Sequence, residues 1–177
     1  MKRYRPVIAA AALVLAAGVA HPRPVDAQRA SPHETVTATV DGAKISVTYG
    51  RPYKKGRQVA GGLIPFTGVW RTGADEATTL TSDKALMFGS LHVGPGDVTL
   101  FTAAAENGPW HLVISKQTGQ WGTDYDAAQD LGRVPMQVGE VSPMVEQFTI
   151  EIHDTPQGGE IVMTWDTTKM TIPFTVM

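Results

Sequence analysis

The sequence predicts an all-β protein, a single-domain antiparallel β-sandwich of jelly-roll type. Six runs after residue 30 alternate apolar with polar residues, which is the period of a half-buried strand. Turn-forming Gly, Pro, Asn and Asp residues separate these runs. No stretch after residue 27 keeps apolar residues at helical spacing, and the best helix candidate, residues 124–131, is at most two turns long. Short strands with close turns favour a sandwich or barrel over any helical fold.

The first predicted element is a hairpin over residues 35–49. Valine and alanine alternate with threonine before Asp41-Gly42, and Ile45, Val47 and Tyr49 continue the alternation after it. An Asp-Gly pair between two such runs is typical of a type I′ turn. Further strands are predicted at residues 110–114, 148–153, 161–165 and 170–176. Pro173 has no N–H to donate, so the last run is predicted at a sheet edge.

Residues 50–75 have neither a strand nor a helix period. The segment nevertheless contains Leu63, Ile64, Phe66 and Trp70. Loops longer than about 12–15 residues are uncommon in compact domains and are usually functional or disordered. Because its apolar content argues against disorder, we predict an ordered loop that packs over the sandwich and covers a polar cleft.

Residues 1–27 are predicted to be a secretory signal peptide. Three basic residues precede an apolar run of 14 residues, Val7 to Ala20, and Val25-Asp26-Ala27 fits a small-x-small cleavage site. A run of that length is shorter than the roughly 20 residues of a spanning helix. The sequence therefore predicts export to the periplasm or outside the cell, with residues 28–177 as one domain and no membrane span in it.

Charge and cysteine content exclude several classes of function. The signal holds four basic residues and one acidic residue, so residues 28–177 carry 11 basic and 16 acidic residues, a net charge of −5. This balance argues against nucleic acid as a partner. The chain has no cysteine, so an exported domain must be stabilised by core burial without disulfides.

Several strings of the chain resemble those of an exported bacterial family known only as a domain of unknown function, DUF2911. They are SPHE at 31–34, GRP at 50–52, GGLIP at 61–65, VWRTGADEAT at 69–78 and QWGT at 120–123. The family more often has asparagine at the position of Asp75. The resemblance implies a single exported domain and implies no particular chemistry.

One group of polar and aromatic residues is the candidate ligand-binding site. A guanidinium pairs bidentately with carboxylate or phosphate, and tryptophan offers a face for a sugar or a cation. Alternatively, the arginines pair with the nearby acids and fix the long loop to the sandwich. The candidate residues are His33, Glu34, Arg51, Trp70, Arg71, Asp75, Glu76 and Trp121.

Two local patterns leave alternatives open. Ser31, followed by proline and by Glu34 three positions later, is the capping-box pattern and would need one helical turn before the first strand. Trp110 and Trp165 are in phase with apolar strand positions, so both are predicted to be core residues. Trp121 instead lies in a turn-like stretch, and it is therefore the better candidate to line a pocket beside Trp70.

The sequence contains no recognised catalytic or metal-binding motif. It has no Gly-x-Ser-x-Gly elbow, no zinc-type histidine spacing and no EF-hand glycine among the acids at 124–130. We therefore predict no metal, cofactor or catalytic residue, and a non-catalytic module that binds a small polar ligand or serves the cell envelope. The alternative is a hydrolase or isomerase that uses His33 with Glu34, Asp75 or Glu76.

Overall fold

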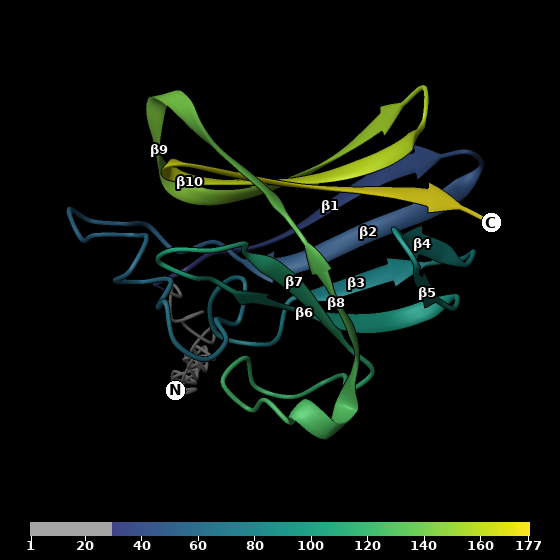
Figure 1. Ribbon diagram of the computed structural model, residues 1–177, viewed down its shortest axis with the longest axis horizontal. Helices are drawn as coiled ribbons and strands as arrows, with labels where there is room; N and C mark the ends of the chain where they lie inside the picture. The colour runs from purple at the N-terminus through teal and green to yellow at the C-terminus, as the bar shows by residue number, and fades with distance from the viewer. Residues whose placement is uncertain (1–29) are drawn as a thin grey trace, which may run out of the picture.

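A computed structural model describes residues 30–177, and the predicted signal peptide lies outside the described residues. Two antiparallel sheets pack face to face, which confirms the predicted all-β sandwich (Figure 1). The jelly-roll connectivity remains a prediction. No helix among the described residues is long and apolar enough to cross a membrane.

The larger sheet has six strands in the order β1-β2-β3-β6-β7-β8. Their bounds are β1 His33–Val40, β2 Ala43–Gly50, β3 Thr79–Ser82, β6 Gly96–Ala103, β7 His111–Ser115 and β8 Asp130–Pro135. The β1-β2 hairpin confirms the prediction: Asp41 and Gly42 both have positive φ, as a type I′ turn requires. The helix candidate at 124–131 is a single 3₁₀ turn, η1, at Ala127–Gln129.

The smaller sheet has the order β5-β4-β10-β9. Its strands are β4 Leu86–Phe88, β5 Leu91–Val93, β9 Gln137–Thr155 and β10 Gly158–Val176. The predicted edge position of the last run is wrong, because β10 lies between β4 and β9. Pro173 is tolerated there because β10 pairs with β9 only up to Thr171 and with β4 only from Thr175, so no pairing is registered at the proline.

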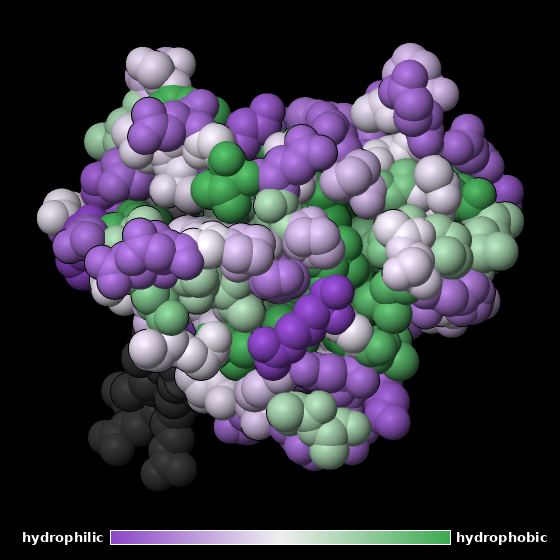
Figure 2. All heavy atoms as spheres, in the orientation of Figure 1, coloured by the Kyte–Doolittle hydropathy of each residue, from purple (hydrophilic) through white to green (hydrophobic). Residues whose placement is uncertain are grey.

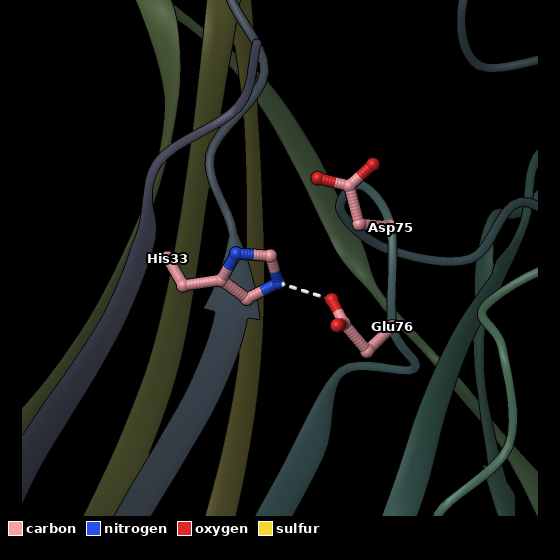
Figure 3. A group of neighbouring side chains, drawn as sticks. All are labelled: His33, Asp75 and Glu76. Atoms are coloured by element: carbon pink, nitrogen blue, oxygen red, sulfur yellow. Dashed lines mark ion pairs between the residues drawn. The ribbon is translucent and has the colours of Figure 1, made fainter. Parts of the chain in front are cut away.

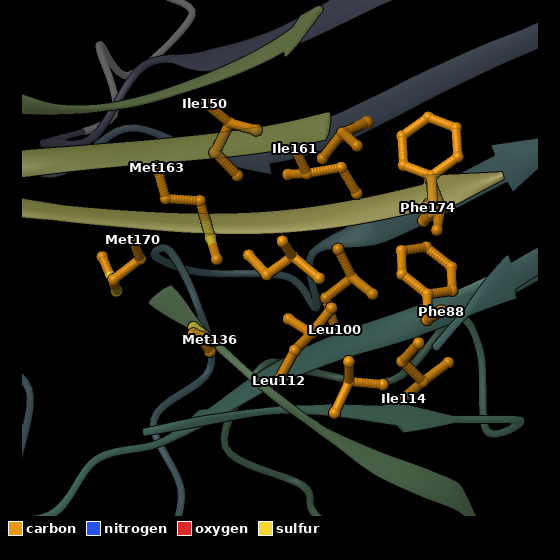
Figure 4. Close-up of a cluster of buried hydrophobic side chains, with 14 of the residues drawn as sticks. Phe88, Leu100, Leu112, Ile114, Met136, Ile150, Ile161, Met163, Met170 and Phe174 are labelled. Atoms are coloured by element: carbon orange, nitrogen blue, oxygen red, sulfur yellow. The ribbon is translucent and has the colours of Figure 1, made fainter. Parts of the chain in front are cut away.

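The core lies between the two sheets. Ile150, Ile161 and Met163 of the smaller sheet face Leu100 and Leu112 of the larger one (Figure 4). Trp110 and Trp165 are buried, as predicted. β1 also lies beside β9, and β5 beside β8, so the sheets approach one another at their edges. Figure 2 shows polar and apolar residues interspersed over the face shown.

Candidate functional site

The long segment between β2 and β3 is ordered and packs across the end of the larger sheet, as predicted. Val59, Ile64 and Trp70 within it are buried. The Trp70 N–H donates to the Thr102 carbonyl at 2.7 Å, and the Thr102 N–H returns a bond to Trp70 at 2.8 Å. Farther along, the Gly122 N–H donates to the Asp75 carbonyl at 2.9 Å. The segment is therefore held between β6 and the stretch around residue 121.

A tight turn at residues 72–75 brings this segment against the β1-β2 hairpin. Thr72 and Asp75 both adopt positive φ, 51° and 64°, a region that non-glycine residues seldom occupy. The Thr78 hydroxyl donates to the Thr72 carbonyl at 2.7 Å. Gly50, the last residue of β2, lies so close that a Cβ there would be 2.2 Å from the Ala74 carbonyl oxygen. Glycine at position 50 is what allows this approach.

His33 is the register partner of Gly50. It therefore lies close to Asp75, the last residue of this turn, and to Glu76, which follows it. The His33 Nε2 lies 2.8 Å from Oε2 of Glu76. One ligand atom each from His33, Asp75 and Glu76 lies within 4.8 Å of the others. Figure 3 shows the imidazole and the Glu76 carboxylate pointing toward one another, whereas the Asp75 carboxylate lies nearby and points away from this pair. Both acids also line a hollow of about 330 Å³, together with Trp121.

Glu34 and Arg51 form a second, separate cluster. Glu34 continues the inward-facing series of β1, so it lies on the other face of the strand from His33. Arg51 Nη1 is 2.6 Å from Glu34 Oε2, and the same guanidinium donates to the Phe148 carbonyl and to the Thr149 hydroxyl. The predicted pairing of Arg51 with a nearby acid is thus found here. It ties the hairpin to β9.

Tyr49 borders the Arg51 cluster from within the core. Its hydroxyl accepts a hydrogen bond from the Ile150 N–H at 2.8 Å, and burial raises the pKa of the phenol above its usual value. The tyrosine is therefore neutral and acts as a structural support. The helical turn that the capping-box pattern predicts is absent from residues 31–34, since β1 already begins at His33.

A cavity of about 740 Å³ opens beside the long segment and shares Asp75 with the small hollow. Trp70 and Trp165 line it from the core side. Trp70 is only 8% exposed and stacks on Trp165 with ring centroids 5.7 Å apart. The pair forms a rigid aromatic wall of the cavity.

The charged residues of the cavity lining are mostly basic. Lys55, Arg57 and Arg71 line it, against one acid, Asp75. Arg71 is half-buried and its Nε donates to the Gly73 carbonyl at 3.3 Å. Within residues 30–177 its guanidinium has no carboxylate at ion-pair distance, so the predicted pairing of Arg71 with Asp75 or Glu76 is not found.

A family model described as a protein of unknown function, DUF2911, matches residues 31–174. The chain belongs to the DUF2911 family. No match was found among curated proteins or among solved structures. The match spans every strand from β1 to β9, most of β10 and the long segment, so the turn at 72–75 and both clusters lie inside the family domain.

The DUF2911 domain thus divides the eight candidate residues among three places. His33, Asp75 and Glu76 converge, Glu34 and Arg51 form a structural pair, and Arg71 and Trp70 line the larger cavity. Trp121 is 47% exposed and borders only the small hollow, so it does not share a cavity with Trp70. Sequence reasoning missed Lys55 and Arg57 as lining residues, because their polar surroundings are equally typical of a solvated loop.

Proposed function

We propose that this DUF2911 protein is an exported module that binds a small anionic ligand in the cavity beside residues 51–78. The observation that carries the proposal is Arg71, a half-buried guanidinium that lines the cavity and has no carboxylate partner among the described residues. A partly desolvated guanidinium favours a planar anion such as carboxylate or phosphate. The basic segment at residues 2–5 and the apolar run after it support export.

The size and lining of the cavity also favour a small molecule. Its volume of about 740 Å³ falls inside the roughly 300–1,000 Å³ typical of ligand sites. Lys55 and Arg57 add positive charge to a chain that is otherwise acidic. The Trp70-Trp165 wall offers an apolar surface for the body of the ligand. Together these features fit an anion attached to a sugar or another ring.

A calorimetric and thermal-shift screen tests this proposal. Carboxylates and phosphorylated sugars should raise the melting temperature, because they bind only the folded state, whereas the matched neutral sugars should not. Arg71→Ala should weaken binding of the best anion about 10- to 100-fold, the value of one or two charge-assisted hydrogen bonds. Arg133→Ala is the matched control, since Arg133 does not line the cavity. Equal binding by wild type and Arg71→Ala would contradict the proposal.

A hydrolase or isomerase is the second candidate, and one contact favours it. The 2.8 Å contact from His33 to Glu76 resembles the base-orienting pair of many acid-base sites. Glu34 lies on the opposite face of β1 and pairs with Arg51, so it is not part of this arrangement. We expect His33→Ala to abolish any activity found in a screen of ester, amide and glycoside substrates. Unchanged turnover in His33→Ala would exclude this candidate.

A further inference from the structure

Three side chains with metal-ligand chemistry converge at the start of β1. The imidazole of His33 comes from the hairpin, and the carboxylates of Asp75 and Glu76 come from the turn that packs against it. Their ligand atoms lie within 4.8 Å of one another. Around a tetrahedral zinc ion with bonds of about 2.0–2.2 Å, ligand atoms lie roughly 3.4 Å apart. To bind such an ion, the 2.8 Å contact between His33 and Glu76 would lengthen and the Asp75 carboxylate would rotate toward them.

The backbone holds these residues in place independently of any ion. Consecutive residues in an extended chain point to opposite sides, but Asp75 is not extended, having a φ of 64°, and a carboxylate oxygen of each acid lies within 4.8 Å of the His33 imidazole. The contact at Gly50, which leaves no room for a Cβ against Ala74, fixes the distance between the turn and the hairpin. The three ligands are therefore organised by main-chain geometry that does not depend on their own contacts.

The two carboxylates of this cluster and the small hollow beside it also favour a bound cation. The Asp75 carboxylate makes no hydrogen bond or ion pair within the part of the chain that the structure describes, although Arg71 is nearby in sequence. A nearby positive charge stabilises both carboxylates in their charged form. The small hollow beside Trp121 leaves room for water molecules to complete a coordination shell.

We propose that His33, Asp75 and Glu76 bind a divalent transition-metal ion, with zinc as the best fit. An imidazole nitrogen suits zinc and its neighbours in the first transition row, whereas sites for calcium and magnesium consist of oxygen ligands. Three protein ligands with solvent in the remaining position is the pattern of an open zinc site. Asp75 also lines the anion cavity, but the zinc site does not rest on the proposed anionic ligand.

Isothermal titration of zinc into tag-free, chelator-treated protein tests the site. We expect one zinc ion per chain, and calcium should bind at least about tenfold more weakly, because it does not use the imidazole nitrogen. Both His33→Ala and Glu76→Gln should weaken zinc binding at least about tenfold. Glu76 is exposed, so Glu76→Gln keeps the measurement informative even if His33→Ala fails to fold.

His153→Ala is a matched control for the zinc titration. His153 also lies near two glutamates, but Glu160 faces its Nδ1 at 3.2 Å and Glu151 faces its Nε2 at 3.9 Å. Those carboxylates lie on different sides of the ring, so they do not converge on one ion. We expect His153→Ala to bind zinc as the wild type does. Absent zinc binding, equal calcium binding, or unchanged binding in His33→Ala and Glu76→Gln would overturn the proposal.

Discussion

Gly50→Ala is expected to destabilise the protein by about 3 kcal/mol, at the upper end of the usual cost of overpacking. The new Cβ would lie 2.2 Å from the Ala74 carbonyl oxygen and 2.9 Å from its carbonyl carbon. Both are backbone atoms, so no side-chain rotation relieves the clash. The turn at residues 72–75 must move away from β2, and Asp75 and Glu76 would move with it.

Gly50→Ala should therefore weaken zinc binding as well as lower the free energy of unfolding. We expect urea unfolding to show the lower free energy and zinc titration to show weaker binding in the fraction that remains folded. Gly94→Ala is the control, because nothing lies within 4 Å of the corresponding Cβ and its φ is not positive. If Gly50→Ala unfolds at the same urea concentration as Gly94→Ala, then the close approach of the turn to β2 is not as described.

The sequence predicts only the strands that have their own local alternation: β1, β2, β7, β9 and β10 are expected, whereas β3, β4, β5, β6 and β8 are not. The β1-β2 hairpin needs only the period of two and the Asp41-Gly42 turn, and both are present in residues 33–50. The position of β10 could not be predicted in the same way. Pro173 indicates only that its own N–H is unpaired, and it does not exclude a strand whose two ends pair with different neighbours.

The candidate site shows the same division between local and long-range information. In the structure, alternation along β1 places His33 and Glu34 on opposite faces. The sequence predicts the hairpin only from residue 35 and leaves a helical turn open at residues 31–34, so it does not predict this separation. The contact between His33 and Glu76 depends on the approach of Ala74 to Gly50. That approach joins segments that no sequence spacing relates, which explains why this contact was not recognisable in the sequence.

The two tryptophans of the predicted site should differ sharply when each is replaced by alanine. Trp70 stacks on Trp165 at 5.7 Å and meets Phe148 edge-on at 5.0 Å. Trp70→Ala removes a buried ring, and we expect a loss of about 3 to 5 kcal/mol in the free energy of unfolding. Trp121 is 47% exposed, and Trp121→Ala should cost only about 0.5 kcal/mol.

Denaturant unfolding of both variants measures this difference, and anion titration of the folded Trp70→Ala protein adds a second readout. Because Trp70 lines the larger cavity and Trp121 does not, only the first variant should lose affinity for the anionic ligand. Equal destabilisation by the two substitutions would mean that Trp70 is not packed in the core. A stable Trp70→Ala protein with intact anion binding would remove the aromatic wall from the proposed site, leaving Arg71 and its basic neighbours as the whole of it.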